Sequence, residues 1–207
     1  MALDLTYLAL GDSTGTGVGA SSGGGYPERL LRRLQAARPG IRLLNLCQSG
    51  ATTLDVIETQ LPDAVKLRPS LITVGVGIND VGMGLPEESF AANLQTLLLR
   101  LRKLAAPLAL LNIPDLALAP AVAAMRGSSY QRRIELFNEH LESAAALHGV
   151  LLIDLFTLSR ERLQDGNDLF SPDGFHPSAK GYETWAELIW PPLESLLGDR
   201  RGDARNT

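Results

Sequence analysis

Short, nearly continuous runs of apolar residues alternate with longer amphipathic segments along most of the chain. Each run has the length of a strand and is bounded by glycine, proline or polar residues. Runs of this kind are typical of strands that are buried on both faces of a parallel sheet. The expected strands are Leu5–Leu10, Ile41–Cys47, Leu71–Val76, Leu108–Ile113 and Val150–Ile153.

The segments between these runs place apolar residues at helical spacing. The expected helices are Tyr26–Ala37, Thr53–Lys66, Glu87–Lys103, Ser129–His148 and Ser178–Leu197. Proline lacks the backbone N–H that a helix interior requires. We therefore expect Pro62 to break or kink the second helix, and Pro191-Pro192 to force a break in the last. Five strands that alternate with helices predict an α/β fold with a doubly wound sheet.

Polar, glycine-containing stretches follow the first three expected strands. Gly11-Asp12-Ser13 follows the first, Ser49-Gly50 the second and Gly77-Ile78-Asn79-Asp80 the third. A fourth stretch, Asp173-Gly174-Phe175-His176, lies in the loop between the fifth strand and the last helix. Ligands of doubly wound sheets bind at the carboxyl ends of the strands, so we expect all four stretches to converge on one rim.

These stretches contain one candidate for each group that acyl transfer requires. Ser13 is the candidate nucleophile, His176 the candidate base, and Asp173, three residues earlier, can orient the imidazole. The backbone N–H groups of Ser13 and Gly50 and the side chain of Asn79 are candidate oxyanion donors. Taken singly, each residue also has an ordinary structural interpretation, as a turn serine, a helix cap beside a surface histidine, a turn glycine or an Asx-turn asparagine.

Two other motifs overlap or closely follow the candidate nucleophile. Gly15 to Ala20 fits the dinucleotide-binding pattern G-x-G-x-x-A, but the next helix begins only near Pro27, and the second strand ends in Cys47-Gln48 without a carboxylate for a ribose. Gly11 to Gly15 fits G-x-S-x-G, the nucleophile elbow of α/β-hydrolases. That elbow follows several strands of a larger sheet, whereas this motif follows the first strand.

The overall composition limits the classes of partner and the cellular compartments that are expected for this chain. The 207 residues include 19 basic and 23 acidic ones, for a net charge of −4, which argues against nucleic acid as a partner. Cys47 is the single cysteine, so no intramolecular disulfide is expected. No segment approaches the ~20 apolar residues of a membrane span, and the N-terminus lacks the features of a signal peptide. We expect a cytoplasmic protein, although removal of an export signal would leave the same sequence.

Metal and cofactor sites are not expected from the remaining histidines. His140 and His148 lie on or at the end of an expected helix, without further ligands at metal-binding spacing. We therefore interpret both as structural residues and expect neither a metal nor a cofactor.

Taken together, Ser13, Gly50, Asn79 and His176 resemble, in this order, the residues that define the SGNH, or GDSL-type, esterase/lipase family, and Asp173 completes an Asp-x-x-His motif. The resemblance covers roughly residues 5–197. It implies a flavodoxin-like, three-layer α/β/α sandwich with a five-stranded parallel sheet. The length predicts a single domain, the hydrolase domain over residues 1–197, and the polar residues 198–207 are expected to form a disordered tail.

The resemblance further implies hydrolysis of carboxylic esters or thioesters through an acyl-serine intermediate, without a metal. Ser13 would be the nucleophile, His176 the general base and then acid, and Asp173 the orienting acid. Ser13 N–H, Gly50 N–H and the Asn79 side chain would bind the oxyanion. Thr14 stands where the leucine of the GDSL name is usual, and Cys47 where a smaller residue is usual. These departures leave the substrate open.

The substrate is expected to be a small-molecule ester or thioester with a short acyl group, because no long hydrophobic lid segment is evident. Lysophospholipids and acetylated sugars remain alternatives within the family, and a ligand-binding module without chemistry remains an alternative outside it. Oligomeric state is not predicted. The candidates for lining an acyl pocket are Met83, Leu85, Leu116, Leu118 and Phe175.

Overall fold

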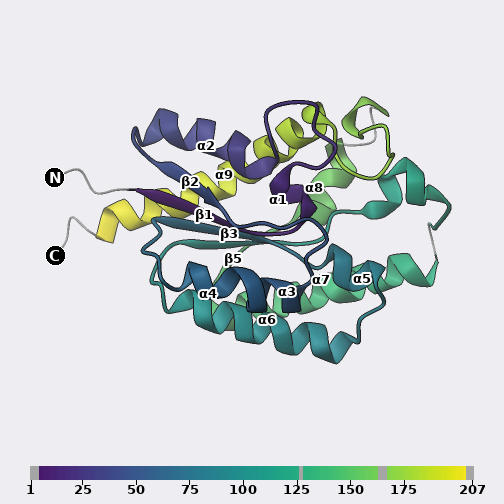
Figure 1. Cartoon of the computed structure of the whole chain (residues 1–207), viewed down its shortest axis with the longest axis horizontal. Coiled ribbons are helices and arrows are strands. Elements are labelled where there is room, and N and C mark those ends of the chain that lie inside the picture. Colours follow the sequence, from purple (N-terminus) through teal and green to yellow (C-terminus); the bar gives the residue numbers. More distant parts are fainter. Residues whose placement is uncertain (1–4, 126–127, 163–166, 204–207) are drawn as a thin grey trace.

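A five-stranded parallel sheet forms the centre of the computed structural model, which describes residues 5–125, 128–162 and 167–203 (Figure 1). The strands are β1 (Thr6–Gly11), β2 (Arg42–Asn45), β3 (Leu71–Gly75), β4 (Leu108–Leu111) and β5 (Leu151–Ile153). Their order across the sheet is β2-β1-β3-β4-β5, and every pair of neighbours runs parallel. The chain moves outward from β1 to β2 and then crosses back to β3, so the topological switch point lies between β1 and β3.

Helices cover both faces of the sheet, which confirms the expected three-layer α/β/α sandwich (Figure 1). α2 (Tyr26–Ala37), α8 (Leu155–Arg162) and α9 (Ala179–Asp203) lie on one face. The opposite face carries α6 (Glu87–Arg102) and α7 (Ser129–His148) together with the short α3 (Thr53–Asp55), α4 (Leu61–Ala64) and α5 (Ile78–Gly82).

Alternate residues of β1 belong to two separate hydrophobic cores. Leu8 and Leu10 pack in the core beneath α6 and α7, whereas Tyr7 and Ala9 pack in the core beneath α2 and α9. All four side chains are fully buried. This alternation follows from the two-residue period of a strand, and it explains why the strand reads as a continuous apolar run.

The predicted break at Pro191-Pro192 is wrong, because α9 passes through both prolines from Ala179 to Asp203. Each interior proline costs about 3 kcal/mol or more. Ile189 and Leu193, on either side of the pair, are fully buried against the sheet, and each such side chain contributes about 1.5–3 kcal/mol. Together with Tyr182, Trp185 and Leu197 of the same helix, which pack in the same core, this burial offsets the lost backbone hydrogen bonds. Residues 204–207 of the expected tail lie outside the described residues.

The disruption expected near Pro62 takes the form of a π-helical segment, η1 (Val56–Gln60), between α3 and α4. The helix resumes at Leu61 with Pro62 in its first turn, where a missing N–H is tolerated. The π-helical turn leaves the side chain of Gln60 almost completely buried, at 1% exposure.

Two histidines of α7 join that helix to α6. His140 Nε2 lies 2.6 Å from Glu87 Oε1, and His148 Nε2 lies 2.6 Å from Gln95 Oε1.

Over the described residues, none of the helices is both long enough and apolar enough to cross a bilayer.

Candidate active site

Ser13 is held at the carboxyl end of β1 by a tight turn. Gly11 has a φ of +147°, and a Cβ at this position would lie 2.1 Å from the carbonyl oxygen of Gly75, so only glycine fits. Asp12 then caps the short helix α1 (Ser13–Thr16), accepting hydrogen bonds from Thr14 N–H at 2.9 Å and Thr14 Oγ1 at 2.8 Å. Ser13 is therefore the first residue of a helix at the rim of the sheet, next to the switch point.

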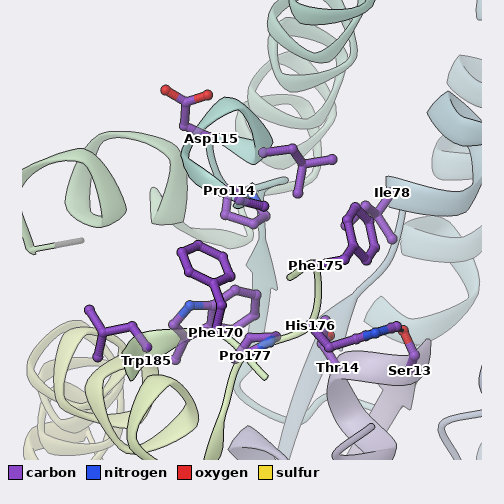
Figure 2. A pocket seen from close by; sticks show the side chains of 13 residues that line it. Ser13, Thr14, Ile78, Pro114, Asp115, Phe170, Phe175, His176, Pro177 and Trp185 are labelled. Carbon is purple, nitrogen blue, oxygen red and sulfur yellow. Dashed lines mark hydrogen bonds between the residues drawn. The ribbon is translucent and has the colours of Figure 1, made fainter. Parts of the chain in front are cut away.

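His176 reaches Ser13 from the loop that precedes α9. Its Nε2 lies 3.1 Å from Ser13 Oγ (Figure 2). Its Nδ1 lies 2.7 Å from Asp173 Oδ2. A left-handed turn at Gly174, with a φ of +68°, brings Asp173 and His176 together. Three residues that the sequence suggested as a set thus form one hydrogen-bonded chain, Ser13–His176–Asp173.

The carboxylate of Asp173 is held by several donors besides the imidazole. Asp173 Oδ1 accepts hydrogen bonds from Ser171 Oγ at 2.7 Å, Phe175 N–H at 2.8 Å and His176 N–H at 2.9 Å. Partial desolvation acts to raise the pKa of Asp173, but the hydrogen bonds from His176, Phe175 and Ser171 outweigh it and lower this pKa below its ordinary value. The carboxylate therefore stays ionised and can hold the imidazole in one orientation.

Gly50 and Asn79 lie in neighbouring segments. Gly50 is exposed in the loop after β2, with a φ of +81° that favours glycine. Asn79 lies in the first turn of α5, and its Nδ2 donates to the carbonyl of Ala51 at 2.9 Å. A side-chain amide has two N–H donors, so this contact fixes the amide group and leaves a second donor for a ligand.

Two buried carboxylates support the same rim. Asp12 is 2% exposed, and burial raises its pKa to about 6, although the hydrogen bonds from Thr14 act to lower it. Asp80 is fully buried, and burial likewise raises its pKa while the hydrogen bonds from Thr53 act to lower it. Thr53 donates its N–H to both oxygens of Asp80, at 3.0 and 3.2 Å, which ties α3 to α5.

An apolar pocket opens beside Ser13 and His176 (Figure 2). Its apolar lining consists of Ile78, Pro114, Leu116, Ala119, Leu169, Phe170, Phe175, Pro177 and Trp185. Of the five lining candidates from the sequence, Leu116 and Phe175 belong to it, whereas Leu85 and Leu118 do not and Met83 is 63% exposed. Sequence reasoning missed Trp185 as a pocket residue, because its helical spacing marked it only as a core-facing residue of α9.

One wall of this pocket is fixed by an ion pair. Asp115 caps the short 3-10 helix η2 (Leu116–Leu118) by accepting a hydrogen bond from Ala117 N–H at 3.1 Å. Its other carboxylate oxygen accepts from Arg160 Nε of α8 at 2.7 Å. Ala121 N–H, just after this wall, donates to the carbonyl of Gly174 at 3.0 Å. The pocket wall is thus bonded both to α8 and to the loop that carries His176.

A model of the GDSL-like Lipase/Acylhydrolase family matches residues 9–184, a span that includes Ser13, Gly50, Asn79, Asp173 and His176. The chain belongs to this family. Membership in the GDSL-like family places the chain among the carboxylic ester hydrolases.

Named relatives and solved structures agree with the family assignment. The chain is 28% identical to a GDSL-like esterase of Mycobacterium tuberculosis over 95% of its own length, and it spans 64% of that relative, slightly under two thirds. It is 26% identical to the esterase TesA of Pseudomonas aeruginosa, covering 93% of this chain and 89% of TesA. A crystal structure of a protein named TesA matches with a TM-score of 0.76 and 25% identity, covering 92% of this chain and 99% of the other.

Proposed function

We propose that this member of the GDSL-like family hydrolyses carboxylic esters through an acyl-serine intermediate on Ser13. The observation that carries the proposal is the hydrogen-bonded chain from Ser13 through His176 to Asp173 beside an apolar pocket. A serine hydroxyl is a weak nucleophile until an adjacent base removes its proton. Here the Ser13 Oγ to His176 Nε2 distance of 3.1 Å is within the reach of that proton transfer.

In the first half of the reaction, Ser13 Oγ bonds to the ester carbonyl carbon while its proton passes to His176 Nε2. The tetrahedral intermediate then collapses, the carbon–oxygen bond to the alcohol breaks, and the imidazolium returns the proton to the departing alcohol. In the second half, water attacks the acyl-serine, with its proton passing to His176 and then to Ser13 Oγ. The net reaction consumes one water and releases the acid and the alcohol.

The negative oxygen of the tetrahedral intermediate requires donors that are already in place. We assign this role to the N–H groups of Ser13 and Gly50 and to the side-chain amide of Asn79. Two features support the assignment: the Ser13 N–H lies in the first turn of α1, where helical N–H groups lack internal partners, and Asn79 is bonded to Ala51, the residue after Gly50.

The pocket beside Ser13 suits an apolar acyl group. Aromatic side chains, among them Phe170, Phe175 and Trp185, line the pocket together with aliphatic residues. We therefore propose small esters with short acyl chains as substrates, and thioesters as alternatives that use the same groups. The relatives named esterase are consistent with this choice.

Covalent labelling tests the mechanism directly. The intact protein is treated with a fluorophosphonate and weighed by mass spectrometry. One adduct is expected on the wild type and none on Ser13→Ala, while the exposed-serine control Ser89→Ala labels like the wild type. A Ser13→Ala variant that still labels, or that still hydrolyses nitrophenyl esters, would contradict the proposal. Acyl ester binding without turnover by the wild type would instead support a ligand-binding module.

A further inference from the structure

Gln60 is a buried polar residue that the proposed reaction does not use. It is the last residue of the π-helical segment η1, and it is 1% exposed. Its side chain makes two hydrogen bonds to one residue, Gly11: Gly11 N–H donates to Gln60 Oε1 at 2.9 Å, and Gln60 Nε2 donates to Gly11 O at 2.8 Å. Buried amides need such partners, and this one finds both on the residue that ends β1.

The side chain of Gln60 supplies an acceptor that the backbone of a longer β2 would otherwise supply. The β1–β2 ladder ends at the pair Ala9 and Asn45. In a continuing parallel ladder, Gly11 N–H would donate to a backbone carbonyl of the neighbouring strand, but here it donates to Gln60 Oε1. The carboxamide of Gln60 therefore satisfies the N–H at the carboxyl end of β1, on Gly11, the residue that precedes Asp12 and Ser13.

Gly11 is the position where such support matters most. Its φ of +147° and its close approach to Gly75 O require a glycine, and a glycine has no side chain whose packing could hold its orientation. The peptide groups on both sides of Gly11 are oriented by hydrogen bonds, and Gln60 contributes one bond to each.

The carbonyl oxygen of Gly11 also accepts a hydrogen bond from the loop that carries Gly50. Gln48 N–H donates to Gly11 O at 3.0 Å, beside the bond from Gln60 Nε2. Gly11 is thus the point where the turn before Ser13, the loop before Gly50 and the η1 segment are joined.

We propose that Gln60 is a positioning residue, which acts through Gly11 to set the direction of the chain into Ser13 and the placement of the Gly50 loop beside it. The proposal rests on the proposed role of Ser13 as nucleophile. π-helical turns inside helices frequently occur at functional sites, and here the turn places the carboxamide against β1. Without these bonds, we expect substrate to bind as before but to react more slowly.

The test compares Gln60→Met with Gln35→Met. Methionine has a similar volume and neither of the two hydrogen-bonding groups. Gln35 is exposed on α2, and it also bonds a backbone carbonyl, that of Ile41, at the opposite end of the sheet. For Gln60→Met we expect kcat to fall by about 10–100-fold with KM within about twofold, since small misplacements of reacting groups cost that much. The rate constant for inactivation by a fluorophosphonate should fall in parallel, and Gln35→Met should match the wild type.

A Gln60→Met variant with unchanged kcat, or with a loss in KM alone, would overturn the positioning role. If Gln60→Met does not fold, Gln60→Glu takes its place, because its carboxylate keeps an acceptor for Gly11 N–H but offers no donor to Gly11 O. Gln60→Glu with the kcat of the wild type would also overturn the role. Ser13→Ala, measured in the same assay, separates the two proposals. If Ser13→Ala keeps its activity, the proposed role of Ser13 as nucleophile is wrong. If Ser13→Ala is inactive and Gln60→Met has the kcat of the wild type, only the positioning role of Gln60 is wrong.

Discussion

Asn79 Nδ2 donates to the carbonyl oxygen of Ala51 at 2.9 Å, so α5 and the loop after β2 are directly bonded. These two segments follow β3 and β2, which are not neighbours in the sheet, because β1 lies between them. The bond therefore joins segments that follow the two strands on either side of β1, the strand that leads to Ser13. It holds the amide of Asn79 and the residue after Gly50 in one arrangement before substrate arrives.

Replacement of Asn79 by alanine should reduce turnover far more than substrate binding. The lost donor acts on an oxygen that becomes negative only in the transition state, and such a loss typically costs about 10²–10³ in kcat. Steady-state kinetics with a nitrophenyl ester measure kcat and KM separately. An effect confined to KM would contradict the oxyanion role of Asn79.

Replacement of Asp173 by asparagine should lower kcat by about 10³–10⁴-fold. The carboxamide is neutral, so it cannot stabilise the imidazolium of His176, and its NH₂ group can face Nδ1 and impose the wrong tautomer. Asp63→Asn is the matched control, because Asp63 is exposed and pairs with Lys66 on the surface. Equal activity in the two variants would remove Asp173 from the mechanism.

Truncation of Phe170 should shift the chain-length preference towards longer acyl groups. Phe170 lines the pocket, and it is only partly buried, so its loss enlarges the pocket without emptying the core. One methylene in a hydrophobic pocket is worth about 1–3 kcal/mol, so we expect Phe170→Ala to raise the ratio of kcat/KM for hexanoate over acetate esters by about tenfold. The control is Leu99→Ala, at a residue that is 55% exposed. An unchanged ratio would mean that the acyl group lies elsewhere.

The position of a residue just after a buried strand could be predicted from sequence. Ser13, Gly50 and Asn79 each follow a strand, and parallel strands bring their carboxyl ends to the same rim. The Asp173–His176 contact is also local, since three residues and a glycine turn create it. The contact of His176 with Ser13 depends on how α8 and α9 pack, and the sequence indicated it only indirectly, through the groups that acyl transfer requires and the shared rim of parallel strands.

Features that arise from packing between elements could not be predicted. Pro191-Pro192 reads as a helix break because local propensity takes no account of the buried Ile189 and Leu193 on either side. In the sequence, Gln60 is one polar position in an amphipathic helix. Its neighbours in the sequence predict neither a π-helical turn nor a hydrogen bond to Gly11, which lies 49 positions away. Contacts of this kind become visible only in the tertiary structure, because they join residues that are far apart in the sequence.

The buried carboxylate of Asp12 should make stability depend on pH in a direction opposite to that of most paired carboxylates. Its pKa in the folded protein is about 6, above the ordinary value of about 3.9 for the unfolded chain. Between about pH 4 and 6 the folded state therefore binds more protons than the unfolded state, and this contribution to the free energy of unfolding falls as pH rises. Above pH 6 the ionised group costs about 3 kcal/mol, at 1.36 kcal/mol per pKa unit.

Asparagine at this position removes the charge and keeps an oxygen for the two hydrogen bonds from Thr14. We expect Asp12→Asn to be more stable than the wild type at pH 7 by up to about 3 kcal/mol, with the difference shrinking towards zero near pH 4. Urea unfolding of both proteins at several pH values between 4 and 7 measures this difference, in which the contributions of groups that do not interact with Asp12 cancel. A difference that stays constant across this range would show that the carboxyl of Asp12 does not titrate there.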